Sequence, residues 1–339
     1  MKFYKKIIKK HKKIILLLSI LIGLAIFFAI PKNGGNVIYG VTFSKPFAEH
    51  LGLDWKATYL ALLDDAGVKR VRLPSYWTEI ESQKGVYNFK DLDWQIQEAQ
   101  KRDVKIILTL GQKQPRWPEC HIPKWAEDLN EHERQTKLID FISKVVERYR
   151  NRENIINWQI ENEPFLPFGE CPKFNKNFFD REVAQVRLLD SRSLIISDSG
   201  ELSTWYRASS RADILGTTLY RIVWNDTVGY VHYPITSIAY RLKAAIIMLM
   251  TGVDKIIIVE LQAEPWGPKM IIETPLHEQY KSMSPEQFQK NIEFVKHVEF
   301  SEAYLWGGEW WYWLKTVKGD DRIWNQARKV FSESAKLEK

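Results

Sequence analysis

Two glutamates that follow apolar runs could supply the chemistry of glycosidic-bond cleavage. Glu163 lies between Asn162 and a proline, three residues after the end of the apolar run Ile155–Ile160, and Glu260 follows a second run, Lys255–Val259. Two carboxyl groups at the ends of two buried strands could work as a pair. One would protonate the leaving oxygen, and the other would attack or stabilise the anomeric carbon. A general acid must keep its proton at neutral pH, so burial or a neighbouring anion would have to raise its pKa.

Each of these glutamates has a rival close by in the sequence. Glu161 would share the strand face of Glu163 and is the alternative acid. Glu264 has the same strand parity as Glu260, but four extended residues add about 13 Å and would carry it well past the end of the strand. We therefore favour Glu163 as the acid and Glu260 as the nucleophile.

The pattern from Val37 onward alternates short apolar runs with longer helical ones, which predicts parallel strands joined by helices. The expected strands are Val37–Thr42, Lys69–Leu73, Lys105–Leu110, Ile155–Ile160, Ser193–Ser197, Ile214–Leu219, Lys255–Val259 and Ala303–Trp306. The expected helices lie near Trp55–Ala66, Asp91–Arg102, Glu131–Arg150, Asp180–Leu189, Thr236–Thr251, Pro285–Val298 and Asp321–Ser334. Eight strands with helices between them are what a (β/α)8 barrel requires. A doubly wound open sheet is the alternative, but no glycine-rich turn follows the first strand. The predicted fold is an α/β TIM barrel over residues 37–339.

The first 36 residues differ from the rest of the chain. Seven lysines in residues 1–13 precede Ile14–Ile30, a run without a charge that is at the lower length limit for spanning a bilayer. With the lysines in the cytoplasm, the barrel would lie outside it. We expect a basic tail over 1–13, a single-pass transmembrane signal anchor over 14–30 and a linker over 31–36. Cleavage as a signal peptide, giving a secreted protein, is the alternative, but Ala29–Pro31 is a poor cleavage site.

The net charge of +7 comes from this basic tail. Beyond it, 42 basic residues balance 42 acidic residues, so the barrel is near neutral and a nucleic-acid partner is not expected. The apolar run Ala244–Met250 is too short to span a membrane and should be part of a helix packed on the barrel. No metal-ligand spacing and no phosphate-binding loop occurs, so neither a metal nor another cofactor is expected. We expect a monomer.

The chain has two cysteines, Cys120 and Cys171, which fall in loops after the third and fourth expected strands. Adjacent loops of a barrel lie side by side, so a disulfide between them is plausible in an exported chain. Two free thiols are the alternative.

Together these features resemble clan A of the glycoside hydrolases, the retaining (β/α)8 enzymes, and most of all the family 5 cellulase and mannanase type. The resemblance covers nearly all of residues 37–315. The matching segments are Val71-Arg72-Leu73-Pro74 with Trp77, the run Glu81–Phe89 with Leu92-Asp93, Asn162-Glu163, Glu260 and Trp306. Two positions depart from the family pattern. Thr109–Gln112 lacks the histidine often seen on the third strand, and Thr218 stands where many members have a second one.

The resemblance implies a double displacement in which Glu163 is the acid/base and Glu260 the nucleophile. It also implies four substrate-site residues: Arg72 beneath Glu260, Asn162 at the sugar 2-hydroxyl, Tyr220 beside the nucleophile, and Trp306 as the floor of the subsite that holds the attacked sugar.

Fourteen tryptophans are an unusually large number, and some of them could stack on sugar rings. Trp77 and Trp117 are the strongest candidates, and the others near the predicted active face are Trp125, Trp266, Trp310, Trp311 and Trp313. The expected function is a membrane-anchored β-glycoside hydrolase with a carbohydrate substrate. The alternatives are a sugar-binding barrel without catalysis, a transglycosylase that uses the same intermediate, and a scaffold that presents loops to a partner protein.

Overall fold

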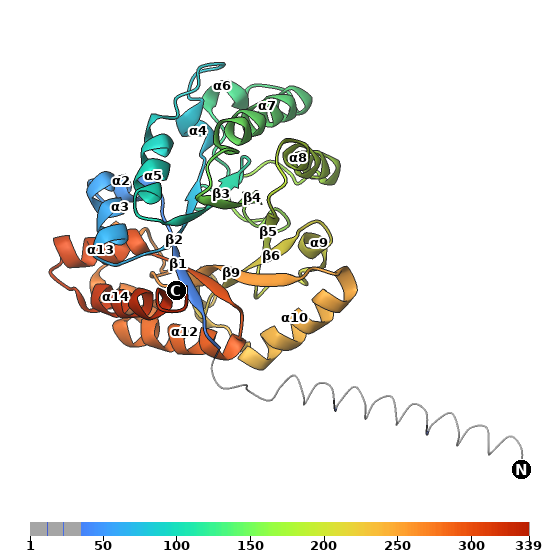
Figure 1. Ribbon diagram of the computed structural model, residues 1–339. Coiled ribbons are helices and arrows are strands. Elements are labelled where there is room, and N and C mark those ends of the chain that lie inside the picture. The colour runs from blue at the N-terminus through green and yellow to red at the C-terminus, as the bar shows by residue number, and fades with distance from the viewer. Residues whose placement is uncertain (1–11, 13–22, 24–34, 339) are drawn as a thin grey trace, which may run out of the picture.

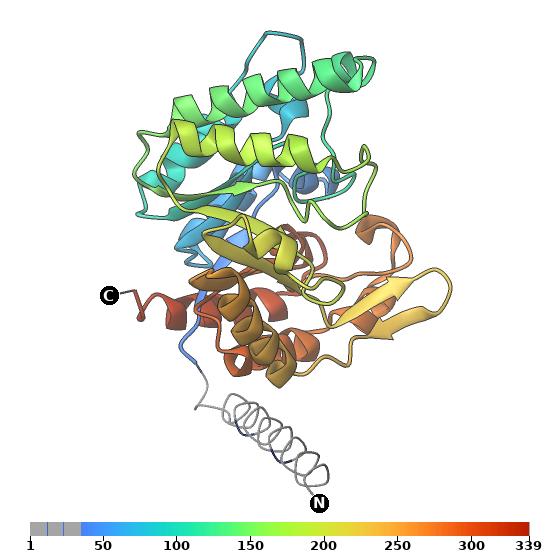
Figure 2. The ribbon, with the colours of Figure 1, turned by 90° about the vertical axis from the view of Figure 1, so that its right-hand side faces the viewer.

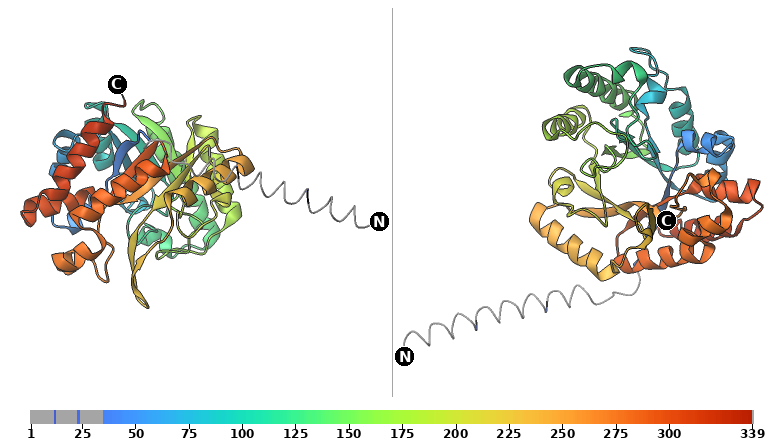
Figure 3. Two further views of the ribbon diagram at one scale, coloured as in Figure 1. Left: turned by 90° about the horizontal axis from the view of Figure 1, so that it is seen from below. Right: turned by 180° about the vertical axis from the view of Figure 1, so that it is seen from behind.

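The computed structural model describes residues 12, 23 and 35–338. In residues 35–338, eight parallel strands close into a barrel and helices surround it (Figures 1 and 3). Around the barrel the strands are β1 (Ile38–Thr42), β2 (Arg70–Pro74), β3 (Lys105–Leu110), β4 (Ile155–Ile160), β5 (Leu194–Asp198), β6 (Ile214–Leu219), β9 (Lys255–Gln262) and β10 (Glu302–Trp306). Strand β10 pairs with β1 and completes the ring, which confirms the predicted barrel.

The longer helices of the outer layer are α3 (Trp55–Asp64), α5 (Lys90–Gln100), α7 (Glu131–Tyr149), α8 (Lys176–Leu189), α10 (Ser237–Thr251), α12 (Pro285–Val298), α13 (Gly308–Val317) and α14 (Arg322–Ser334). The shorter ones are α2 (Lys45–His50), α4 (Trp77–Ile80), α6 (Lys124–Glu127), α9 (Tyr206–Ser209), α11 (Leu276–Ser282) and a 3-10 turn, Ile271–Glu273. Side-chain caps fix several helix starts. Asn130 accepts from the Glu133 amide at 3.0 Å before α7, and Ser284 accepts from the Gln287 amide at 3.2 Å before α12.

The barrel buries both faces of its strands, as parallel strands covered by helices must. Inside the ring, a compact apolar core consists of Ile107, Ile195, Ile257, Val259 and Tyr304. Gly40 on β1 makes room for one of these side chains, because a Cβ there would lie 2.6 Å from the Tyr304 ring. A larger apolar layer between strands and helices completes the packing.

Two features of the strands were not expected from the sequence. Strand β9 continues to Gln262, so Glu260 lies within the strand rather than after it. An antiparallel hairpin of β7 (Ile222–Asn225) and β8 (Gly229–His232) follows β6 and projects from the barrel (Figure 2). Its turn is stabilised by the Asn225 side chain, which accepts from the Thr227 amide at 3.0 Å, and by Gly229 with φ of 78°.

The predicted tail and anchor lie outside the described residues, except for the single positions 12 and 23. Among the residues that the structure describes, no helix is both long and apolar enough to cross a membrane. The apolar run Ala244–Met250 forms the second half of α10, and only part of it packs on the barrel. Ala244 and Ile247 are buried, whereas Leu249 and Met250 are exposed.

Candidate active site

A cleft of about 1060 Å³ opens over the carboxyl ends of the strands. Glu163 and Glu260 both line it, together with Tyr220, Trp306 and the exposed ring of Trp117. Its walls come from the hairpin β7–β8 and from the loops that follow β3, β4 and β9. In a (β/α)8 barrel this end of the strands is where catalytic side chains converge.

Glu163 reaches the cleft through a sharp turn after β4. The backbone of Glu161 and Glu163 is left-handed, with φ of 54° and 42°. Ser197 at the end of β5 accepts from the Glu163 amide at 2.9 Å, and the Lys113 ammonium donates to the Glu163 carbonyl at 3.0 Å. These bonds hold a strained backbone in place, and such strain is common where a side chain must be aimed at a reaction.

The Glu163 carboxyl group is buried next to other acidic groups. Burial, then the charges of Glu260 and Glu119, raise its pKa well above the ordinary value of a glutamate. Thr218 shows how close the two catalytic candidates lie. It pairs with Glu260 in the β6–β9 register, and its hydroxyl donates to Oε1 of Glu163 at 3.4 Å. A buried carboxyl with a raised pKa can carry a proton at neutral pH.

Glu260 is held through both of its carboxylate oxygens. Arg72 on β2 donates to Oε1 at 3.0 Å, and the Tyr220 hydroxyl donates to Oε2 at 3.0 Å. Burial, then the charge of Glu260, raises the pKa of Tyr220 well above its usual value, so this phenol remains a hydrogen-bond donor. Fixed donors on both oxygens leave the carboxylate little freedom to rotate.

Arg72 links Glu260 to Asn162, the residue before Glu163. Its fully buried guanidinium also donates to Gln159 Oε1 at 2.8 Å and to Asn162 Oδ1 at 2.7 Å. The carbonyl end of the Asn162 amide therefore faces Arg72, and its nitrogen faces Glu119. One arginine thus sets the positions of both the residue before Glu163 and the carboxylate of Glu260.

A third carboxyl group, Glu119, enters the cleft from the loop after β3. Asn162 Nδ2 donates to its Oε2 at 3.2 Å. Burial, then the charge of Glu260, raises the pKa of Glu119 to about 8. Sequence reasoning missed this residue because it lies in an irregular loop, and the one available clue was its neighbour Cys120. Cys120 and Cys171 form a disulfide, which confirms the predicted pairing and ties this loop to the loop after β4.

The two rival glutamates have other partners. Glu161 accepts from the backbone amides of Gln112 and Lys113, so it fastens the loop after β3 from outside the cleft. Glu264 does line the cleft, where it forms an ion pair with Arg116 and accepts from Trp306 Nε1 at 2.8 Å.

Arg116 is another residue that sequence reasoning missed. Its guanidinium stacks between two rings, 3.7 Å from the centroid of Phe47 and 4.2 Å from that of Trp306. It also forms an ion pair with Glu309 at 3.0 Å. Trp306 is therefore fixed by stacking on one face and by its indole N–H, as a rigid platform in a sugar site would be.

The tryptophans divide between the cleft and the core. Trp117, which precedes a cis-proline, is 55% exposed at the cleft's edge, and Trp266 lines the cleft beside Tyr220. Trp77 is fully buried between Phe141 and Trp125, and its indole donates to Glu81 at 2.8 Å. The prediction that Trp77 stacks on a sugar is therefore wrong. Of the other four candidates, Trp125 does not line the cleft, and its indole donates to the Glu81 carbonyl at 2.8 Å. Trp310, Trp311 and Trp313 are buried in α13.

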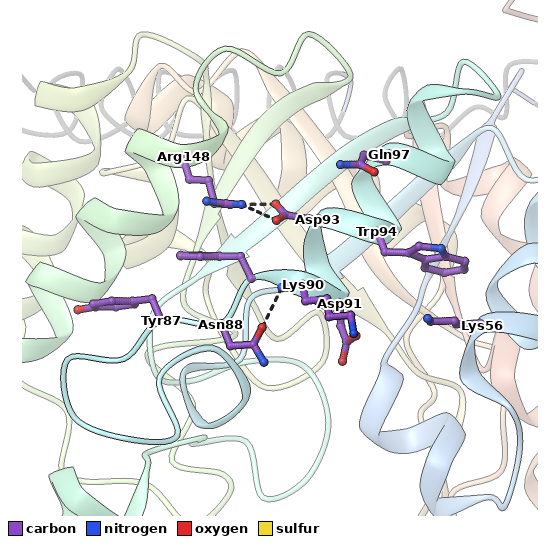
Figure 4. Close-up of a pocket in the computed structure, with 10 residues that line it drawn as sticks. Lys56, Tyr87, Asn88, Lys90, Asp91, Asp93, Trp94, Gln97 and Arg148 are labelled. Carbon is purple, nitrogen blue, oxygen red and sulfur yellow. Dashed lines mark hydrogen bonds and ion pairs between the residues drawn. The ribbon is translucent and has the colours of Figure 1, made fainter.

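A second hollow, of about 460 Å³, lies on the outside of the barrel around α5 (Figure 4). Both of its carboxylates are in ion pairs. Arg148 Nε donates to Asp93 at 2.9 Å, and Asp91 forms an ion pair with Lys45 at 2.8 Å. No predicted site residue lines it. In residues 35–338 and at the two other described positions, no cluster of histidine, cysteine or acidic side chains could hold a metal.

Comparison with known proteins gives relatives that act on carbohydrates. The family "Cellulase (glycosyl hydrolase family 5)" matches residues 40–232. The β-galactosidase BgaA of Clostridium cellulovorans is 27% identical over an alignment of 172 residues, and the match covers 44% of this chain and 26% of that protein. This chain therefore spans only about a quarter of that relative's length.

Solved structures share the fold at low sequence identity. The β-galactosidase of the haloarchaeon Halorubrum lacusprofundi has a TM-score of 0.59 and 15% identity, over 88% of this chain and 58% of that one. The family 10 endo-β-1,4-xylanase of Gloeophyllum trabeum has a TM-score of 0.53 and 16% identity, over 82% and 85% of the two chains. Because the family match covers more than half of the sequence and the barrel places paired glutamates in one cleft, this chain belongs to glycosyl hydrolase family 5, the cellulase family.

Proposed function

We propose that this protein is a membrane-anchored, retaining β-glycoside hydrolase in which Glu163 is the acid/base and Glu260 the nucleophile. One observation carries the proposal: a buried carboxyl group with a raised pKa lies beside a second carboxyl group whose two oxygens are held by Arg72 and Tyr220. The first group is suited to give a proton and the second to attack a carbon.

The reaction would take two steps. In the first, the Glu163 proton moves to the glycosidic oxygen, the bond from this oxygen to the anomeric carbon breaks, and Glu260 forms an ester bond to that carbon. In the second, ionised Glu163 takes a proton from water, the water oxygen attacks the anomeric carbon, and Glu260 leaves as a carboxylate. Two inversions restore the original configuration.

The electrostatics of the site suit this change of role. The charge of Glu260 is one cause of the raised pKa of Glu163. When Glu260 becomes an ester, that charge disappears and the pKa of Glu163 should fall. The acid of the first step thereby becomes a competent base for the second.

The substrate class is inferred from the names of relatives and from the shape of the cleft. The relatives named above include β-galactosidases and an endo-β-1,4-xylanase, which supports a β-linked sugar substrate. The open cleft, with Trp117 exposed at its edge, suits an oligo- or polysaccharide.

The location is inferred from the N-terminal sequence and from the disulfide. A lysine-rich tail before the uncharged run Ile14–Ile30 supports a signal anchor with the barrel outside the cytoplasm. The Cys120–Cys171 disulfide supports the same side of the membrane, because disulfides persist in oxidising compartments.

The test is to trap the covalent intermediate. Full-length protein in detergent is incubated with cyclophellitol-type probes of gluco, galacto, xylo and manno configuration, and the labelled peptide is identified by mass spectrometry. Label on Glu260 is expected, with none in Glu260→Gln and undiminished label in Glu127→Gln, a change on the exposed side of α6. Label on Glu264 would show that Glu264, and not Glu260, is the nucleophile. Failure of every probe to label a folded protein that still binds glycans would favour a sugar-binding barrel.

A further inference from the structure

Helix α10 exposes apolar side chains on its outer face. Leu249 is 89% exposed, Met250 61% and Ile246 56%, although the inner face of the same helix buries Tyr240 and Ile247. A surface helix of a soluble domain normally has polar side chains on its outer face. The helix therefore has more apolar surface than its packing on the barrel requires.

The exposed side chains form a continuous stripe. Ile238, the partly exposed Leu242, Ile246 and Leu249 follow one another at spacings of four, four and three residues, which places them on one side of the helix. The stripe is about 17 Å long. No acidic residue occurs in Ser237–Thr251. Beside it, α9 adds the half-exposed Tyr206.

The point where the chain leads into the first barrel strand lies close to α10. The Gly35 amide donates to the Lys296 carbonyl at 3.0 Å, in the last turn of α12. The residue that ends this helix, Glu299, forms an ion pair with Arg241 of α10 at 2.9 Å. Helices α10 and α12 are neighbours in Figure 1. From Arg241 to Leu249 the distance along the helix axis is about 12 Å.

The linker before Gly35 is short. Four residues separate Ile30 from Gly35, so even a fully extended chain spans at most about 17 Å between them. If Ile14–Ile30 spans the bilayer, Gly35 stays within that distance of the apolar layer. The surfaces nearest to Gly35 would then meet the lipid headgroups. Beside Gly35, α12 has the pair Lys296–Glu293 and α10 has Arg241, paired to Glu299. About 12 Å along α10 from Arg241, the exposed side chains are apolar.

We propose that the outer face of α10 lies in the headgroup region of the same bilayer, with Ile246, Leu249 and Met250 inserted among the upper acyl chains. The proposal rests on the proposed membrane anchoring. An amphipathic helix in this setting lies in the plane of the interface with its apolar face buried by about 5–10 Å. A second copy of the chain is less suited to cover this face. The whole outer face of α10 is about 22 Å long and 10 Å wide, and this area is much smaller than the roughly 800 Å² that each subunit contributes to a standard interface.

The experiment measures the depth of one side chain. Full-length protein carrying Leu249→Cys is labelled with an environment-sensitive dye, with the native disulfide kept oxidised, and placed in phosphatidylcholine vesicles that contain a doxyl-labelled lipid. Leu188→Cys on α8 is the matched control, because Leu188 is also a leucine and is 80% exposed. The emission at position 249 should shift to the blue and be quenched at least about threefold more than at position 188. Equal quenching at the two positions would overturn the proposal.

Two further measurements separate the possible failures. Flotation of the full chain with vesicles tests the anchor alone. A chain that does not float contradicts the proposed anchoring, whereas a chain that floats without quenching at position 249 contradicts only the docking of α10. Ile246→Glu with Met250→Glu in the labelled protein should abolish the quenching while flotation persists. Self-quenching that depends on protein density, without quenching by lipid, would overturn the proposal and show that a second copy of the chain covers this face of α10.

Discussion

Asn162 donates its side-chain N–H to Oε2 of Glu119 at 3.2 Å, and this bond brings a third carboxyl group to the two proposed catalytic ones. The carbonyl oxygen of the same amide accepts from Arg72. Asn162 is therefore fixed between a cation and an acid whose pKa is raised to about 8 by burial and by the charge of Glu260. Below that pH Glu119 is mostly protonated, so Glu119, Glu163 and Glu260 together hold less negative charge than three carboxylates would.

The first prediction concerns the alkaline limb of activity. As pH rises through about 8, Glu119 should ionise beside Glu163 and Glu260 and lower kcat/KM. Glu119→Gln mimics the protonated form, so its kcat/KM should stay near wild type at pH 6 and fall less than that of wild type at pH 9. The pH profile of both proteins between 5 and 10 checks this. Identical alkaline limbs in the two proteins would show that ionisation of Glu119 does not affect kcat/KM.

The second prediction concerns the leaving group. Glu163→Ala should reduce hydrolysis of alkyl or sugar leaving groups by about 10²–10⁴-fold, because protonation of the leaving oxygen is lost. With a dinitrophenyl leaving group, which needs no proton, the first step should remain close to wild type. Burst kinetics on both substrates measure this difference. Equal losses on the two substrates would assign Glu163 a structural role.

The third prediction isolates the tyrosine that contacts Glu260. Tyr220→Phe removes one hydrogen bond to a charged oxygen, worth about 1.5–3 kcal/mol, so kcat should fall by about 10- to 100-fold. Tyr59→Phe is the matched control, since its buried hydroxyl donates to the Gln95 carbonyl outside the cleft. A similar loss of kcat in both variants would point to a general packing effect.

Part of this site could be predicted from the sequence, because the barrel follows from local patterns. Glu163 and Tyr220 lie just after β4 and β6, Glu260 lies near the end of β9, and the closure of the ring brings them together. Arg72 lies in the middle of β2 and reaches Glu260 across the barrel. Trp77 was misassigned because its position after β2 left open which way the ring points. Its partner Glu81 lies four residues on, and the pair is directed into the core.

Glu119 and Arg116 could not be found in this way. Both belong to the loop after β3, where φ is 73° for Glu119 and 86° for Arg116. The path of such a loop depends on contacts with distant residues. Arg116 pairs with Glu309 and Glu264, and neither partner is indicated by spacing along the chain.

The fourth prediction concerns stability and pH. Burial raises the pKa of Glu161 to about 7, and burial and the neighbouring Glu161 raise that of Glu182 well above its usual value. Groups whose folded pKa is raised stabilise the fold at low pH and lose this contribution as pH rises through the folded pKa. The thermal midpoint should therefore be higher at pH 5 than at pH 8, other conditions being equal. Glu182→Gln should flatten this dependence, whereas Glu127→Gln should leave it unchanged.

The fifth prediction concerns the disulfide. Cys120→Ser with Cys171→Ser should lower the free energy of unfolding by about 2–4 kcal/mol. It should also lower kcat/KM, because Glu119 precedes Cys120 and would lose its fixed position. Treatment of wild type with a reductant should give the same loss, reversible on reoxidation. Unchanged kcat/KM in the double variant would show that the loop keeps its path without the bond.

The hairpin β7–β8 is joined to the barrel strands at its base, and nearer its tip Tyr230 donates to the Glu278 carboxylate of α11 at 2.9 Å. Gln262 at the end of β9 accepts there from the amides of Arg221 and Ile222, at 2.8 and 3.0 Å. Beyond Ile222 the hairpin pairs with itself, and no barrel strand depends on its register. Its tip can therefore be shortened or lengthened without moving Glu260. If the proposed function is correct, insertions and deletions in this one hairpin could change the number of sugar units bound in the cleft without moving the proposed catalytic groups.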